Sequence, residues 1–143
     1  MNADVNAGGE AQAAGPGPLL VVDAANVVGS VPDGWWRDRR GATERLRDAL
    51  AGYGSGGLPD AVPPLPGPLD VVLVVEGAAR GTEPVPGVRV EAAAGSGDDR
   101  IVEVVAGERA RGRRCVVATA DRELRERVAA LGAETVGPRT VRP

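Results

Sequence analysis

Leu19-Leu20-Val21-Val22-Asp23 is a short apolar run that ends in a carboxylate. A continuous run of this kind, without polar alternation, is typical of a strand that is buried on both faces of a parallel sheet. The sequence predicts further strands over residues 69–75, 87–92, 114–119 and 134–136. Helical spacing of apolar residues predicts helices over residues 36–51, from Ser96 to about Arg109, and after Asp121. Because these strands alternate with helices, we expect a mostly parallel sheet with right-handed crossovers.

The chain has 143 residues, of which 43% are hydrophobic, enough for one domain with a real core. Residues 1–17 are mainly Ala, Gly, Asn and Pro and predict a disordered tail, so the domain is expected to span residues 18–143. Repeated Gly and Pro without periodicity predict a long loop over residues 52–68. The sequence leaves open whether this loop is a disordered insertion or guides a substrate.

Acidic side chains stand at the places where an α/β fold gathers its functional groups. Asp23 and Glu76 end predicted strands, Asp121 follows one by two residues, and Asp98 and Asp99 begin a predicted helix. Because the carboxyl ends of parallel strands meet at one edge, we expect these carboxylates to converge there. Each also has a structural explanation: Asp23, Asp121 and one residue of the Asp98–Asp99 pair can cap helices, and Glu76 can be an ordinary surface residue.

The donor set favours a hard metal ion. Several carboxylates in one place repel one another unless a cation neutralises them, and oxygen ligands suit Mg²⁺ or Mn²⁺. The chain has no His, which excludes a Ser-His-Asp site and a zinc site with His ligands. It also has no Lys, which excludes a Walker-type phosphate lysine. An activated water is therefore the expected nucleophile.

Composition limits the partners. The net charge of −3 argues against a general nucleic-acid coat protein, and the three aromatic residues offer few stacking platforms. Arg37, Arg39 and Arg40 follow the first strand and either grip a nucleic-acid backbone or form a solvated helix start. The chain has a single cysteine, Cys115, which fits a reducing compartment. Its first residues do not resemble a signal peptide, and no apolar run is long enough to span a membrane. The sequence therefore predicts a cytoplasmic protein that does not enter a membrane.

Four segments together resemble the NYN branch of the PIN-like nuclease superfamily. They are Leu19-Leu20-Val21-Val22-Asp23-Ala24-Ala25-Asn26-Val27, Val71-Val72-Leu73-Val74-Val75-Glu76-Gly77, Ser96-Gly97-Asp98-Asp99-Arg100-Ile101 and Val116-Val117-Ala118-Thr119-Ala120-Asp121-Arg122-Glu123-Leu124. The resemblance covers roughly residues 18–138 and implies a PIN-like three-layer α/β sandwich, with a sheet of four to five strands flanked by helices. It implies a metal-dependent endoribonuclease, gives metal-ligand roles to Asp23, Asp98 and Asp121, and makes Asn26 and Thr119 shape the site.

The leading hypothesis is a Mg²⁺- or Mn²⁺-dependent ribonuclease that hydrolyses RNA. In it the metal is held by carboxylates from the set Asp23, Glu76, Asp98, Asp99 and Asp121, with Arg37, Arg39 or Arg40 on phosphate. The alternative is a non-catalytic PIN-like module that binds RNA or regulates, with a protein partner that delivers the RNA. A metal-dependent phosphatase is less favoured, because Asp23-Ala24-Ala25 lacks the second Asp of a phosphoaspartate motif. The sequence leaves open the RNA that is cut, activity on DNA, one metal ion or two, and monomer or homodimer.

Overall fold

The structure is a computed structural model that describes residues 17–142. The predicted tail lies outside the described residues except for Gly17, as does Pro143. Along the chain the elements are β2 (Leu19–Asp23), α1 (Ala24–Gly29), the 3₁₀ helix η1 (Trp35–Arg37), α2 (Arg39–Leu50), α3 (Tyr53–Gly56), β3 (Gly57–Leu58), β4 (Leu65–Pro66), β5 (Asp70–Val75), the 3₁₀ helix η2 (Gly77–Ala79), β6 (Arg89–Ala92), α4 (Gly97–Ala110), β7 (Cys115–Ala118), α5 (Arg122–Ala129), β8 (Glu134–Val136) and α6 (Pro138–Val141).

Within residues 17–142, five strands form one sheet in the order β6-β5-β2-β7-β8, and every pairing is parallel. The first strand in sequence, β2, is thus the central one, and all five of its residues are buried. From β2 the chain builds outward through β5 and β6, and then crosses back to β7 on the other side of β2. The carboxyl ends of β2 and β7 therefore form the point where strand order reverses, which is where α/β sheets place their ligands.

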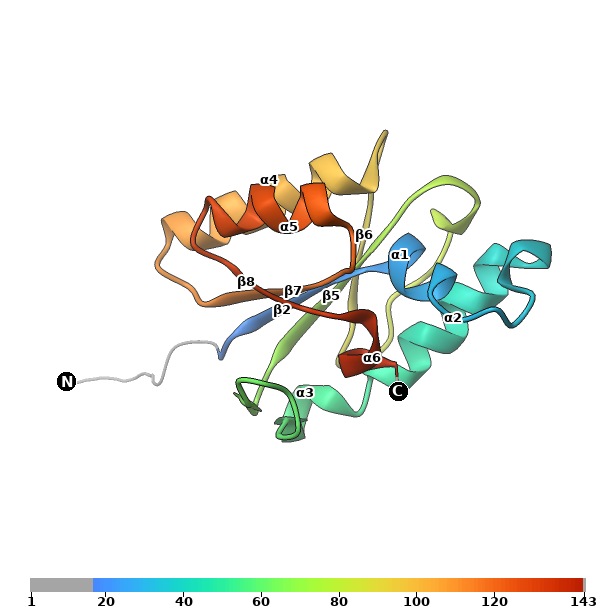
Figure 1. The fold of residues 1–143 in the computed structure, drawn as a ribbon. Helices are drawn as coiled ribbons and strands as arrows, with labels where there is room; N and C mark the ends of the chain where they lie inside the picture. The colour runs from blue at the N-terminus through green and yellow to red at the C-terminus, as the bar shows by residue number, and fades with distance from the viewer. Residues whose placement is uncertain (1–16, 143) are drawn as a thin grey trace.

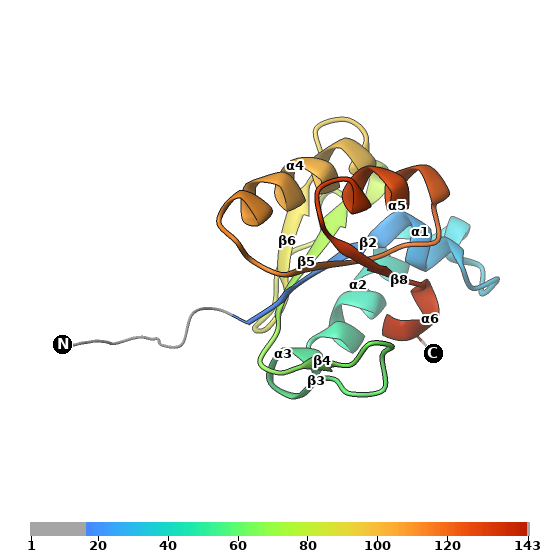
Figure 2. The same cartoon turned by 60° about the vertical axis from the view of Figure 1, so that its left-hand side comes forward.

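Helices cover both faces of the sheet (Figures 1 and 2). Leu19 and Val21 face α4 and α5, and pack there with Ile101 and Leu124. Leu20 and Val22 face the opposite side, in the core cluster to which α1, α2 and α6 contribute. Alternate residues of one strand point to opposite faces, so a strand buried on both sides needs a continuous apolar run. The prediction of a three-layer α/β fold with a mostly parallel sheet is confirmed.

Helix starts follow the capping residues in the sequence. Ser96 accepts the Asp99 backbone N–H at 3.3 Å and begins α4, and Asp121 accepts the Leu124 N–H at 2.9 Å and begins α5. The predicted helix over residues 36–51 begins later than expected, at Arg39. Gly34 lies in the left-handed region at φ 83° and Asp38 caps α2 by accepting from the Gly41 N–H, so residues 35–37 form the separate turn η1.

The segment 52–68, predicted as a loop, contains short ordered elements. Helix α3 leads into the antiparallel pair β3 and β4, visible below the sheet in Figure 2. Leu58 and Leu65 are buried and pack against the core on the α2 side of the sheet. Strands of two residues are too short to produce a recognisable alternation in sequence, which is why the pattern did not predict them.

No helix among residues 17–142 is both long enough and apolar enough to cross a membrane.

Candidate active site

Asp23 is a buried carboxylate at the carboxyl end of the central strand. Its side chain is only 4% exposed. One oxygen, Oδ2, accepts the Thr119 hydroxyl at 2.9 Å, and Oδ1 accepts the Asn26 backbone N–H at 3.4 Å, which caps α1. The pKa of Asp23 is raised from its ordinary 3.8 to about 6: burial is the largest cause, the charges of Asp98 and Glu76 add to it, and the two hydrogen bonds oppose it. The ionised form of Asp23 is therefore unfavourable in the folded protein unless a cation lies nearby.

Thr119 and Asn26 join the two sides of the strand-order reversal. The fully buried Thr119 hydroxyl donates to Asp23 and accepts the Asp121 backbone N–H at 3.1 Å. The Asn26 side-chain oxygen accepts the Ala120 N–H at 2.8 Å. These contacts fix the end of β2 against the start of α5, so both residues shape the edge at which Asp23 lies.

Asp98 lies on the first turn of α4, where its charge and those of the other carboxylates act on one another. Partial burial raises its pKa, the charges of Asp121 and Glu76 raise it further, and the nearby Arg127 opposes them. Because Asp98 also acts on the pKa of Asp23, it interacts with each of the other three carboxylates. Asp98 is thus the member that links the group.

Glu76 reaches this edge from the end of β5. Its Oε1 accepts the Gly97 backbone N–H at 3.0 Å. Glycine at position 97 leaves room for this contact, because a Cβ there would force the end of the Glu76 side chain to shift. The Glu76 side chain therefore reaches the backbone at position 97, where glycine leaves room for it.

Asp99 is turned away from this group. Its carboxylate accepts from Arg127 at 3.0 Å and is 68% exposed. The structure therefore brings together Asp23, Glu76, Asp98 and Asp121, and places Asp99 on the surface of the α4–α5 layer.

The carboxylates at this edge offer a metal ion a partial shell. Among residues 17–142, no group of three or more acidic or cysteine side chains lies close enough together to hold one ion. A closed all-protein shell is therefore not formed by the described residues. Mg²⁺, however, usually keeps several waters and binds through only one or two carboxylates plus substrate phosphate. Asp98 with one neighbouring carboxylate fits that requirement, and the buried, under-stabilised Asp23 is the neighbour with most to gain from a cation.

The three arginines singled out in the sequence have different surroundings. The Arg39 guanidinium lies 5.2 Å from the centre of the Trp35 ring, and that of Arg37 lies 5.8 Å from the centre of the Trp36 ring. Arg40 pairs with Glu44 along α2 at 3.4 Å. Arg39 lines a cavity together with Glu76, one of the clustered carboxylates.

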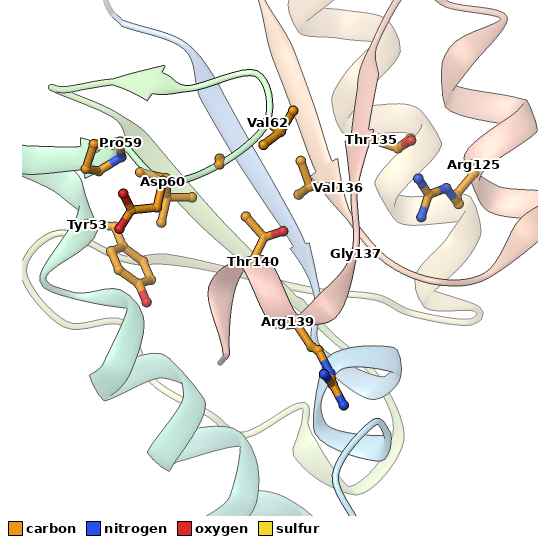
Figure 3. A pocket seen from close by; sticks show the side chains of 13 residues that line it. Tyr53, Pro59, Asp60, Val62, Arg125, Thr135, Val136, Gly137, Arg139 and Thr140 are labelled. Carbon is orange, nitrogen blue, oxygen red and sulfur yellow. The ribbon is translucent and has the colours of Figure 1, made fainter.

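Two wider grooves lie on the β8 side of the site. One of about 770 Å³ extends from Ala120 to Ser30 and α6, and a second of about 540 Å³ lies between β8 and the β3–β4 segment (Figure 3). Arg139 lines both grooves, and in Figure 3 its side chain extends from α6 toward α1. Sequence reasoning missed Arg139, because α6 has only four residues and gives no periodic signal. None of the clustered carboxylates lines either groove.

The fold and the sheet edge define a three-layer α/β protein with a parallel sheet whose central strand ends in a buried carboxylate. No protein-family model matches the chain, and no curated protein matches it. A solved structure does: Rae1 (YacP) from Bacillus subtilis, in its W164L mutant, superposes with a TM-score of 0.62 at 20% sequence identity. The match covers 87% of this chain and 72% of that chain. At this identity the likeness shows the fold alone, and membership of the NYN branch stays a prediction.

Proposed function

We propose that this protein is a Mg²⁺- or Mn²⁺-dependent ribonuclease that hydrolyses RNA phosphodiester bonds at the edge formed by β2 and β7. The observation that carries the proposal is Asp23: a carboxylate buried at the point of strand-order reversal, with Asp98 and Glu76 close enough to raise its pKa. A buried anion next to other anions is costly unless a cation binds there. The PIN-like architecture that the chain shares with a solved structure supports the same reading.

In the proposed site, Asp23 and Asp98 hold the metal ion, with Asp121 and Glu76 at its margin. When bound, the ion supplies charge neutralisation and water activation for in-line displacement at phosphorus. Thr119 holds the Asp23 carboxylate in one orientation through its hydroxyl. Asn26 fixes the backbone at Ala120, and so keeps the β2 and β7 ends at constant separation.

Arginines on two sides of this edge suit the substrate phosphates. Arg39 lies on the α2 side and Arg139 on the α6 side, and neither forms an ion pair within residues 17–142. A guanidinium without a carboxylate partner can bind a phosphate oxygen without first breaking a salt bridge. Arg139 therefore joins Arg39 as a candidate for contact with the RNA backbone. The proposal also includes a monomeric or homodimeric state and a protein partner that delivers the RNA.

The test is cleavage of labelled single-stranded RNA in Mn²⁺, in Mg²⁺ and in EDTA, by the wild type and by Asp23→Asn. Asp48→Asn is the matched control, because Asp48 lies on α2 with a side chain that is 62% exposed. We expect cleavage that needs the divalent ion, is abolished by Asp23→Asn and is unchanged by Asp48→Asn. Equal cleavage by wild type and Asp23→Asn would exclude this mechanism.

A second candidate function is a PIN-like module that binds RNA without cutting it. It is favoured by one observation, that the described residues hold no ready-made group of three donors for a metal ion. RNA binding that is unaffected by EDTA and by Asp23→Asn, with no cleavage in either ion, would support this candidate.

A further inference from the structure

A small, mostly apolar cavity of about 160 Å³ lies between α1, η1, α2 and η2. Its walls come from Ala25 and Val28 of α1, Trp35 of η1, and Arg39 and Thr43 of α2. We call it the Trp35 cavity. Its size suits one small group rather than a folded segment of a partner, and its lining is too apolar for a phosphate or a free metal ion.

The Trp35 cavity adjoins the candidate active site. Glu76, one of the four clustered carboxylates, lines it, and so does Ala24, the residue directly after Asp23. A group that occupies the cavity therefore lies next to whatever binds at the carboxylates. The groove of about 770 Å³ also reaches the residue next to a clustered carboxylate, Ala120 beside Asp121, but no clustered carboxylate itself lines either of the wider grooves.

The wall of the cavity is built from flat side chains. Trp35 packs against the hydrophobic core, which limits its movement, and the Arg39 guanidinium lies over its ring. Aromatic rings and guanidinium planes are the surfaces on which proteins stack unpaired RNA bases. In contrast, Trp36 is 52% exposed and lines none of the cavities described above.

We propose that the Trp35 cavity binds one unpaired nucleobase of the RNA, next to the phosphate at the carboxylate edge, with the base stacked on the Trp35–Arg39 pair. This inference rests on the proposed ribonuclease function. It makes the substrate single-stranded at that nucleotide, because a base held in a duplex cannot enter a cavity of this size.

The first measurement is nucleotide binding without cleavage. The chain has two Trp residues, so Trp36→Phe leaves Trp35 as the sole indole fluorophore. In EDTA, we expect at least one of the nucleotides AMP, GMP, CMP and UMP to quench the fluorescence of Trp35. Ribose 5-phosphate, which has no base, should leave it unchanged. Ala25→Leu fills the cavity from an exposed position on α1 and is expected to abolish the quenching. Quenching that persists in Ala25→Leu, or no quenching by any of the four, would overturn the proposal.

The second measurement is cleavage of single-stranded RNA in Mn²⁺. One stacked base is worth about 1–3 kcal/mol, so we expect Ala25→Leu to lower kcat/KM by about 5- to 150-fold. The matched control is Ala129→Leu, which adds the same side chain at an exposed helical position at the end of α5. Equal rates for the two variants would overturn the base subsite while leaving the nuclease intact. If the wild type does not cleave, but Ala25→Leu still blocks quenching, the proposed function fails and the subsite stands.

Discussion

Replacing Asp23 by Asn is expected to stabilise the metal-free protein while it abolishes activity. The pKa of Asp23 is raised by burial from 3.8 to about 6, so the folded state binds this proton more tightly than the unfolded state. The stability that the protonated carboxyl contributes is fully present below about pH 3.8 and is lost as the pH rises through 6. A shift of this size corresponds to about 3 kcal/mol at neutral pH and above.

Replacing Asp23 by Asn does not recover the full cost of about 3 kcal/mol. The single oxygen of the Asn amide can accept from either the Thr119 hydroxyl or the Asn26 N–H, whereas the carboxylate accepts from both, and its NH₂ group needs a new partner, at a cost of about 1 kcal/mol or more. We therefore expect Asp23→Asn to raise the free energy of unfolding by about 1–2 kcal/mol at pH 8. The gain should disappear between pH 6 and pH 4, where the wild type becomes protonated.

The assay is urea unfolding in EDTA at pH 4, 6 and 8, followed by far-UV circular dichroism. Asp48→Asn, at an exposed position on α2, serves as the control and should stay within about 1 kcal/mol of wild type at every pH. Mn²⁺ should then raise the stability of the wild type and not that of Asp23→Asn, because a ligand stabilises only the state that binds it. A variant that is less stable than wild type at pH 8 would refute the argument that Asp23 is held at an energetic cost.

Four further outcomes are expected. Thr119→Val removes the hydroxyl that donates to Asp23, so cleavage should fall and the acidic limb of its pH profile should move to higher pH, whereas Thr119→Ser should restore both. Gly97→Ala should displace the Glu76 carboxylate and lower activity, and adding Glu76→Asp should recover part of it, with a coupling of about 0.5–3 kcal/mol in a double-mutant cycle. Asp99→Asn should retain most of the cleavage rate, because Asp99 pairs with Arg127 outside the group; a loss as large as that of Asp98→Asn would contradict its placement. Arg139→Gln should weaken RNA binding and reduce the slope of log K against log salt by about 1, while Arg111→Gln, 78% exposed at the end of α4, should leave the slope unchanged.

The fold could be predicted from sequence because its signals are local. The apolar runs that became β2, β5 and β7 are continuous, and Ser96 and Asp121 cap α4 and α5 as their positions indicate. Strand–helix alternation then limits the topology to a parallel sheet, and parallel strands bring their carboxyl ends to one edge. The expectation that Asp23 and Asp98 approach each other needed no further information.

What could not be predicted depends on contacts between distant parts of the chain. The Thr119 hydroxyl bonds to Asp23 across 96 positions, and no spacing rule connects them. Asp98 and Asp99 are adjacent and chemically identical, and the contact that marks Asp99 as the outward one is made with Arg127, 28 positions further along the chain. The Trp35 cavity arises from four separate elements, so none of its parts is distinctive in sequence.

The place of β2 in the sheet has a consequence for biosynthesis. β2 is the first described strand to leave the ribosome, yet both of its neighbours, β5 and β7, are made later. A nascent chain that has not reached residue 118 leaves one edge of β2 open, and it has neither Thr119 nor Asp121 to complete the surroundings of Asp23. The two halves of the domain cannot fold independently, because the central strand β2 needs β7 (Cys115–Ala118) to complete its pairing. The proposed activity therefore requires that the chain has been made at least through Asp121 and that β7 has paired with β2.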